Sequence, residues 1–273
     1  MSDQTALLVD LTDGVLTLTN NDAPRNRMSF AYMDALEEQV IRAGEDPDVR
    51  VLVFTAEGTD HFSVGMDLKQ LMAEGPKRGV DNVLDQRRRV LGMIENLPKP
   101  SIATLFGYCL GGGLELPLAC HFRFAAATGA QIGLPELDLG TVPAWGGTAR
   151  LVRTVGRDHA LDMILRAKKI DGPRALEIGL VQEVVEDVDA GLERARALAA
   201  RVARNSPTAV ATFKAACLAA LGLPGPERQE IEARAYEHCL DSGEAAIGRE
   251  NFAKVRAGEP VPWGPLKPLS PEG

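Results

Sequence analysis

Two short segments of this sequence place a carboxylate in an apolar setting. In GYCLGGGLELPLAC, three consecutive glycines are followed two residues later by Glu115, which stands among leucines. In GLPELDLG, Glu136 is also flanked by leucine and proline. A carboxylate surrounded by leucine is costly to ionise, and carboxylates with a raised pKa act as general acids or bases. These residues therefore predict acid–base chemistry.

A third segment, FSVGMDLKQL, and the glycine run each place glycine where a loop is expected to lead into a helix. We expect one helix to begin near Asp67 and the other near Gly112. The first amides of a helix have no internal acceptor, and the helix dipole adds positive potential there. Two such helix ends beside two carboxylates suit an oxyanion-binding site with an acid–base pair.

The elements that must position these segments alternate between strand and helix. ALLVDLTDGVLTLTN predicts a hairpin that turns at Asp13–Gly14, and Ser29 is suited to cap the helix that follows. Residues 80–96 have the pattern of an amphipathic helix. Four further segments are typical of strands: VRVLVFTAEG, PSIATLFG, HFRFAAAT and AQIGL. From about residue 146 helices predominate, interrupted by the strand VQEVVE, so we expect an α/β fold with a helical C-terminal third.

Composition excludes several classes of protein. The chain has 273 residues, is 45% hydrophobic and carries a formal net charge of −8, which argues against nucleic-acid binding. No apolar run approaches the roughly 20 residues of a membrane span. Its four cysteines and four histidines are scattered, so we expect neither a metal site nor a disulfide framework. The N-terminus has no basic region followed by an apolar one, and we expect a cytoplasmic protein.

Six segments in order resemble the crotonase superfamily, also called the enoyl-CoA hydratase/isomerase family. They are VLTLTN, VRVLVFTAEG, FSVGMDLK, PSIATLFGYCLGGGLELPLAC, QIGLPELDLGTVPAWGGTARLVRTVG and ALEIGLVQEVV. The resemblance implies a crotonase-type ββα superhelix with a C-terminal helical trimerisation region, assembled as a homotrimer or a dimer of trimers. It divides the chain into a core with the acyl-CoA site (residues 1–200), a helical oligomerisation region (residues 201–257) and a Pro-rich tail (residues 258–273).

The resemblance also implies roles for particular residues. The ligand would be an acyl-CoA thioester, whose carbonyl oxygen would accept hydrogen bonds from the amides of Met66 and Gly112. Glu115 would be the base that orients water and Glu136 the proton donor at C2, which makes enoyl-CoA hydration the expected reaction. Coenzyme A enters as part of the substrate, and no other cofactor is expected. The family pattern places contacts to substrate or coenzyme A at Arg25, Met66, Asp67, Leu68, Lys69 and Gly112.

Other readings of the same residues stay open at this point. A double-bond isomerase or another acyl-CoA lyase uses the same type of oxyanion site, although many isomerases retain only the second glutamate. A non-catalytic acyl-CoA-binding subunit is a further alternative, and Asp67 could merely cap a helix. We expect Gly112 to accept no side chain because the thioester lies against its backbone. Gly112→Ala should then impair catalysis with little loss of thermal stability.

Overall fold

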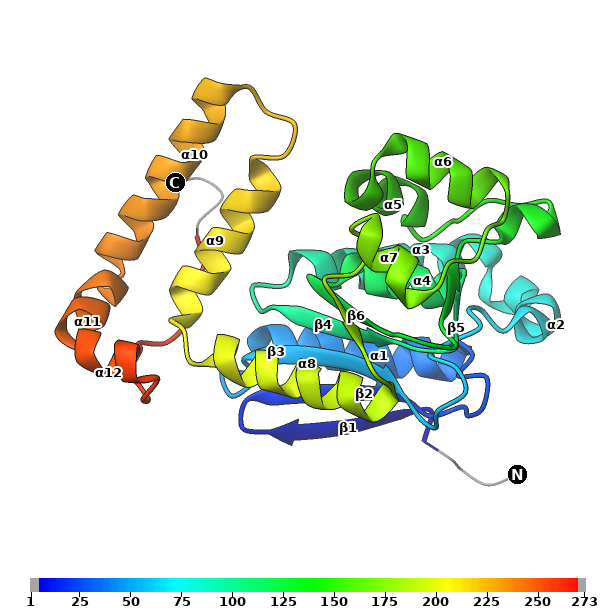
Figure 1. Cartoon of the computed structure of the whole chain (residues 1–273), viewed down its shortest axis with the longest axis horizontal. Coiled ribbons are helices and arrows are strands. Elements are labelled where there is room, and N and C mark those ends of the chain that lie inside the picture. The colour runs from blue at the N-terminus through cyan, green and yellow to red at the C-terminus, as the bar shows by residue number, and fades with distance from the viewer. Residues whose placement is uncertain (1–4, 270–273) are drawn as a thin grey trace.

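The structure, a computed structural model, describes residues 5–269 and is built around a six-stranded sheet (Figure 1). The strands lie in the order β1 (Leu7–Thr12), β2 (Val15–Asn20), β3 (Val51–Ala56), β4 (Ser101–Leu105), β6 (Phe122–Ala126) and β8 (Glu183–Val185). The predicted hairpin is confirmed, since β1 and β2 pair antiparallel, and the following strands pair parallel. A second, two-stranded parallel sheet joins β5 (Tyr108–Leu110) to β7 (Gln131–Gly133).

Helices bury both faces of the larger sheet. Leu52 and Phe54 of β3 belong to the main core, which is shared with α1 (Phe30–Glu45), α3 (Val80–Asn96) and α4 (Gly112–Ala119). Val51 and Val53, which point the other way, pack with Ala195 and Ala199 of α8 (Val188–Ala203). This alternation along one strand is the pattern of a parallel sheet enclosed between two helical layers.

The predicted helix starts agree with the structure. Ser29 caps α1 by accepting a hydrogen bond from the Tyr32 amide at 3.1 Å. The helix predicted near Asp67 is α2 (Leu68–Arg78), with Asp67 as its cap, and α4 begins at Gly112. Across residues 5–269, every helix is either too short or too polar to cross a lipid bilayer. The remaining elements near the site are η1 (Glu136–Leu139), α5 (Gly147–Val155), α6 (Arg157–Leu165) and α7 (Gly172–Glu177).

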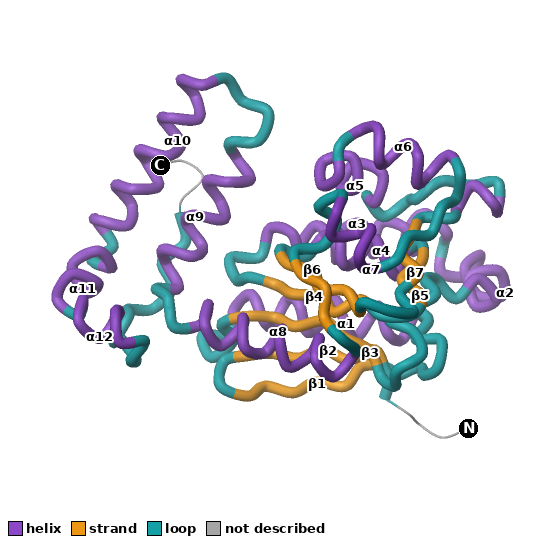
Figure 2. Tube along the Cα trace, viewed as in Figure 1, coloured by secondary structure: helices purple, strands orange, loops and turns teal. Residues whose placement is uncertain are grey.

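The last helices form an arm that projects from the sheet (Figure 2). The arm comprises α9 (Pro207–Ala219), α10 (Gly225–Asp241), α11 (Glu244–Glu250) and α12 (Phe252–Ala257). The predicted region boundary at residue 201 falls inside α8, which continues to pack on the sheet up to Ala203. No residue of α10 is fully buried, and exposure reaches 68% for Phe213, 67% for Tyr236 and 61% for Phe252.

The described part of the Pro-rich segment, residues 258–269, is extended and bound to the arm. The Trp263 indole donates to the Arg204 carbonyl at 2.7 Å, and the Lys267 amide donates to the Thr208 hydroxyl at 3.0 Å. The Lys267 ammonium also donates to the Ser242 carbonyl. These contacts fix a segment that we predicted only as a tail. The ends of the predicted first and last regions, residues 1–4 and 270–273, lie outside the described residues.

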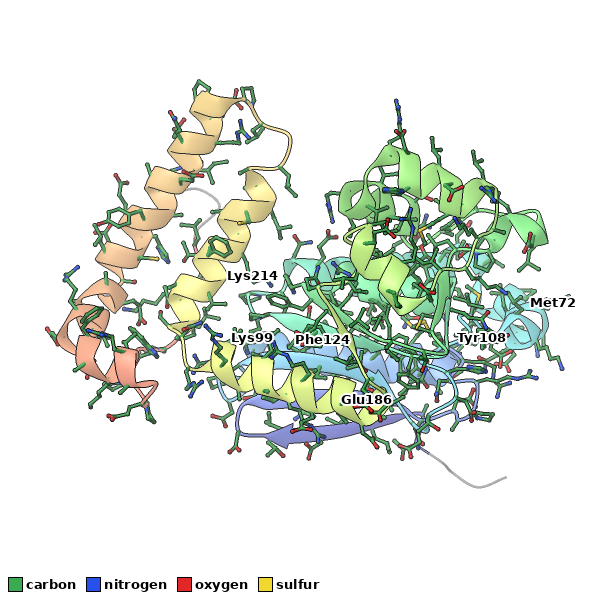
Figure 3. All side chains as sticks on the ribbon, viewed as in Figure 1. Met72, Lys99, Tyr108, Phe124, Glu186 and Lys214 are labelled. Atoms are coloured by element: carbon green, nitrogen blue, oxygen red, sulfur yellow. The ribbon has the colours of Figure 1, made fainter. Side chains whose placement is uncertain are left out.

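Two buried lysines join helix ends at the base of the arm, where Figure 3 labels them. Lys99 donates to the carbonyls of Ala43 and Asp46 at the C-terminal end of α1. Lys214 of α9 donates to the carbonyls of Leu97 and Lys99, just beyond α3. Positive charge is favourable at the C-terminus of a helix, where carbonyl groups lack internal donors. Lys214 therefore attaches the arm to the C-terminal end of α3.

Candidate active site

Two loops are aligned so that the amides of Met66 and Gly112 lie near each other. The Ser63 amide donates to the Tyr108 carbonyl at 2.9 Å, and the Leu110 amide donates to the Ser63 carbonyl at 3.1 Å. A Cβ atom added to Gly65 would lie 3.3 Å from the Gly112 nitrogen, which shows how closely the loops approach. Within residues 5–269, neither the Met66 nor the Gly112 amide has a hydrogen-bond acceptor. The two predicted oxyanion donors therefore lie close together, and the described part of the fold uses neither of them.

Glu115 is held by main-chain amides in the first turn of α4. Its Oε1 accepts hydrogen bonds from the amides of Trp145 and Gly147, both at 2.8 Å, and its side chain is 2% exposed. The pKa of Glu115 is raised to about 7: burial is the main cause and the charge of Glu136 adds to it, while the two amides and Arg150 act in the opposite direction. A carboxyl group with this pKa exchanges protons near neutral pH, as acid–base catalysis requires.

Glu136 occupies a different environment at the start of η1. Its Oε2 is buried and has no hydrogen-bond partner within the described chain. Its Oε1 lies 3.2 Å from the position that a Cβ on Gly111 would take, so the carboxylate faces the glycine run. Burial raises the pKa of Glu136, which favours the protonated form. This carboxyl group is free to bind or protonate a ligand.

One cavity of about 320 Å³ brings these groups together. It lies between α2, on which Figure 3 labels Met72, and the end of β5, the strand on which Figure 3 labels Tyr108. Its polar part contains Glu115 and Glu136, and most of its other walls are apolar. The predicted residues that line it are Met66, Leu68, Gly112, Glu115 and Glu136; the other lining residues include Leu71, Val80, Leu84, Leu139, Val142 and Trp145. The arrangement suits a ligand with an apolar chain and one reactive polar group.

The reason for glycine at position 112 differs from our expectation. A Cβ atom on Gly112 would overlap the indole ring of Trp145, so a neighbouring side chain, and not only a ligand, excludes alanine here. Trp145 is 2% exposed and lies in the segment whose amides hold Glu115. Gly112→Ala is therefore expected to disturb packing as well as catalysis, and we expect a larger loss of thermal stability than the small loss predicted from the sequence.

Three predicted coenzyme A contacts lie outside the cavity. Asp67 caps α2 by accepting from the Gln70 amide at 3.0 Å and pairs with Arg27 at 3.3 Å, so its carboxylate has a structural role. Lys69 is exposed on the first turn of α2. Arg25 is also exposed, and its carbonyl accepts from the Val64 amide at 3.1 Å. Arg25 and Lys69 are thus placed at the outer surface near the loop that carries the Met66 amide.

Sequence reasoning missed the residues that hold Glu115 in place. A Cβ on Gly147 would lie 2.6 Å from Glu115 Cγ, so only glycine lets this amide reach the carboxylate. Gly146 has φ of 97°, a left-handed conformation that favours glycine. Arg150 donates to the Trp145 carbonyl and to Glu95, each at 2.9 Å, and fixes the turn. The Gly146–Gly147 pair at the start of α5 was the available signal, but Glu115, the partner of Gly147, lies 32 residues away in sequence.

Comparison with known proteins agrees with this geometry. The model of the enoyl-CoA hydratase/isomerase family matches residues 10–259. A probable enoyl-CoA hydratase of Bacillus subtilis (strain 168) is 34% identical over 251 residues, covering 92% of this chain and 96% of that protein. Human enoyl-CoA hydratase domain-containing protein 2, mitochondrial, is 34% identical over 88% of this chain and 82% of that protein. The crystal structure of an enoyl-CoA hydratase from Bacillus anthracis has a TM-score of 0.87 at 32% identity, covering 94% of this chain and 98% of that one.

An α/β core that sets two free amides beside one buried and one half-buried carboxylate, both with a raised pKa, defines an enzyme of the crotonase type. The chain belongs to the enoyl-CoA hydratase/isomerase family.

Proposed function

We propose that this protein hydrates trans-2-enoyl-CoA thioesters to 3-hydroxyacyl-CoA. The observation that carries the proposal is a pair of carboxyl groups in a single cavity: Glu115 is buried and held by two amides, and Glu136 is half-buried and keeps one buried oxygen without a partner in the described chain. Hydration needs a base at a water molecule and an acid at C2, and two carboxyl groups with raised pKa values supply both. An acyl-CoA ligand is also consistent with the family.

The proposed reaction assigns one step to each group. The Glu115 carboxylate takes a proton from water while the water oxygen bonds to C3. The π electrons of the double bond move toward C2 and the thioester oxygen, where the amides of Met66 and Gly112 stabilise the negative charge. Protonated Glu136 then gives its proton to C2. The cycle ends with a proton on Glu115 and a charge on Glu136, so a proton exchange restores the starting state.

Ligand binding under this proposal uses both ends of the cavity. The acyl chain lies along the apolar walls, and coenzyme A extends past the exposed Arg25 and Lys69, whose positive charges suit its phosphates. We propose no cofactor, because coenzyme A arrives as part of the substrate and the step is an acid–base reaction. Arg25→Ala and Lys69→Ala should each raise KM and leave kcat nearly unchanged, since neither side chain lines the cavity.

The direct test follows the ultraviolet absorbance of the conjugated double bond with a series of trans-2-enoyl-CoA thioesters. Loss of absorbance and formation of 3-hydroxyacyl-CoA are the expected results. A shift of the double bond in 3-enoyl-CoA, with no hydration of any 2-enoyl-CoA, would instead identify an isomerase. Binding of saturated acyl-CoA without either reaction would identify a binding subunit.

We also propose that the arm formed by α9–α12 assembles the protein into a trimer or a dimer of trimers. The exposed Phe213, Tyr236 and Phe252 and the complete lack of buried residues in α10 support this proposal, because large apolar surfaces on a helix usually contact a partner. Sedimentation equilibrium should give a multiple of three times 29.3 kDa. A stable monomer at micromolar concentration would contradict it.

A further inference from the structure

A buried arginine lies beside the cavity and has no role in the proposed reaction. Arg87 of α3 has 0% exposure. Its Nη1 donates to the Val83 carbonyl at 3.3 Å and to Gln86 Oε1 at 2.7 Å. Its Nε and Nη2 are buried and have no hydrogen-bond partner in the described part of the chain. A buried guanidinium with two unused donors is costly, and such groups usually have an unseen partner.

The unused donors form one edge of the guanidinium, and other arginines of this chain show what that edge binds. Arg27 uses Nε and Nη2 on the two oxygens of Asp22, at 2.7 and 2.9 Å. Arg89 places the same two atoms on Glu37 Oε1, at 2.8 and 2.6 Å. This edge fits a carboxylate because its two N–H groups are parallel. The missing partner of Arg87 therefore has the shape of a carboxylate.

Among residues 5–269, no acidic side chain supplies that partner. Asp34, the acidic residue whose charge acts on Arg87, is already bound to Arg78 at 3.0 Å and to Gln86 at 2.8 Å. Arg78 adds a second positive charge, and both guanidinium groups lie over the Phe30 ring, at 4.7 and 5.2 Å from its centre. Burial lowers the pKa of Arg87 to about 10, so the group is still charged at neutral pH. Of the two positive charges of Arg78 and Arg87, Asp34 neutralises only one, and the charge of Arg87 remains without a partner among the described residues.

Arg87 lies next to the apolar residues of α3 that line the cavity. Val80 and Leu84 of α3 line the cavity, and Arg87 follows them on the same helical face, seven residues after Val80 and three after Leu84. The Arg87 Cζ atom is 5.9 Å from the centre of the Trp145 ring, which also lines the cavity and overlaps the Cβ position of Gly112. A single indole therefore contacts both the oxyanion donor residue and the surroundings of Arg87.

We propose that the enzyme binds short acyl groups that end in a carboxylate, and that this carboxylate pairs with the Nε–Nη2 edge of Arg87. The inference rests on the proposed function in taking an acyl-CoA thioester as the ligand. Methylene groups of such a ligand match the apolar side chains of Val80, Leu84 and Trp145. Because Arg87 has no exposed surface, the terminal carboxylate reaches it when a neighbouring side chain, such as Trp145, turns aside.

The first test measures binding of two unreactive thioesters that differ only at the end of the chain, adipoyl-CoA and hexanoyl-CoA, by calorimetry. The wild-type protein should bind adipoyl-CoA more tightly. Arg87→Met should weaken adipoyl-CoA binding by about 10- to 100-fold, as expected for loss of charge-assisted hydrogen bonds, and leave hexanoyl-CoA binding nearly unchanged. Arg87→Lys, which keeps the charge and loses the edge, should retain only part of the preference.

A matched control is available on the same helix. Arg88 is half-exposed and pairs with Asp85 at 2.7 Å, so Arg88→Met removes a neighbouring charge without touching the cavity. It should leave both affinities unchanged. Thermal unfolding of each variant separates a folding effect from a binding effect: Arg87→Met should not lower Tm, because an apolar side chain replaces an unpaired buried charge.

Several outcomes would overturn the inference. Equal affinity of the wild-type protein for the two thioesters, repeated with the shorter pair glutaryl-CoA and valeryl-CoA, would do so. Arg87→Met weakening both ligands equally, or lowering Tm without changing the preference, would show a structural role. Hydration of trans-2-hexenedioyl-CoA and trans-2-hexenoyl-CoA tests the proposed function separately. If neither is hydrated but the binding preference is found, the hydratase proposal fails and the carboxylate site stands.

Discussion

The first turn of α4 and the short helix η1 each bring a glutamate to the same cavity, yet they hold it in different ways. Glu115 is 2% exposed and receives two amide hydrogen bonds, whereas Glu136 keeps a buried oxygen without a partner in the described chain. The first glutamate is thus part of the packing of the molecule and the second is available to a ligand. Under the proposed reaction, environment and not residue type separates the base, Glu115, from the proton donor, Glu136.

The largest expected effect comes from substitutions that remove the acid–base function of either glutamate. Glu115→Gln and Glu136→Gln should each lower kcat for hydration by about 10²- to 10⁴-fold. Both variants should fold, because glutamine at position 115 still offers an oxygen to the two amides, and glutamine at position 136 has the size of a side chain whose Oε2 has no partner in the described chain. Steady-state kinetics and binding of a saturated acyl-CoA measure both properties. A variant that keeps more than about a tenth of the activity would show that the assigned role is wrong.

Replacing each glutamate by alanine should change the free energy of unfolding by different amounts in the two regions. Glu115→Ala leaves the buried amides of Trp145 and Gly147 without an acceptor, which costs about 1–3 kcal/mol for each group that stays dry. Glu136→Ala breaks no hydrogen bond of the carboxylate Oε2 and should change the free energy of unfolding by less than about 0.5 kcal/mol. Denaturant unfolding measures both. Equal losses would mean that the two glutamates are held alike.

Glycine-to-alanine substitutions, which add one methyl group, test how closely the backbone of α4 and of η1 is packed. Gly112→Ala should cost about 1–3 kcal/mol of stability and also lower kcat, since Trp145 must move and its amide holds Glu115. Gly140→Ala, at the end of η1, meets no atom within 4 Å and only forces alanine to φ of 69°. It should cost about 1 kcal/mol and leave kcat unchanged. The double variant Gly112→Ala with Trp145→Leu should recover stability; failure to recover would exclude the indole as the cause.

The smallest expected effect is a shift in pH dependence. With Glu115 acting as a base of pKa about 7, kcat/KM should rise with pH and level off above that value. Arg150→Met removes a positive charge that lowers this pKa, so the rise should move to higher pH. Arg153→Met is the control, because Arg153 pairs with the same Glu95 and makes no contact with Trp145. An unchanged profile in Arg150→Met would assign the rise to another group.

The same raised pKa affects folding. The folded state binds the Glu115 proton more tightly than the unfolded chain, so the stabilising contribution is complete below the ordinary carboxyl pKa of 4.5 and is lost as pH rises to about 7. The difference in stability between wild type and Glu115→Gln should therefore change over this window. Unfolding free energies at pH 4.5 and 7.5 would measure it.

Local patterns in the sequence were sufficient for the hairpin, for the starts of α1, α2 and α4, and for singling out Glu115 and Glu136, whereas the amides of Met66 and Gly112 were assigned from the family resemblance. The Asp13–Gly14 turn, the Ser29 cap and the glycine junctions each act within a few residues. The residues that hold the site were not predictable in this way. Gly147 acts on a carboxylate 32 residues away, and Lys214 of the arm bonds to a carbonyl 117 residues away. Contacts of that range depend on the completed fold, and one chain gives no local signal for them.

The use of main-chain donors at Met66, Gly112, Trp145 and Gly147 has a consequence for protein engineering and for evolution. A peptide N–H is encoded by nearly every codon, and only proline lacks it. Side chains at Met66 and Trp145 can therefore be varied to reshape the cavity while the amides of these two residues are retained. A library of variants at these two positions that excludes proline would keep the amide donors. Its members would differ in the acyl groups that the cavity can accept. Such separation of chemistry from shape lets one scaffold diversify into many substrate preferences.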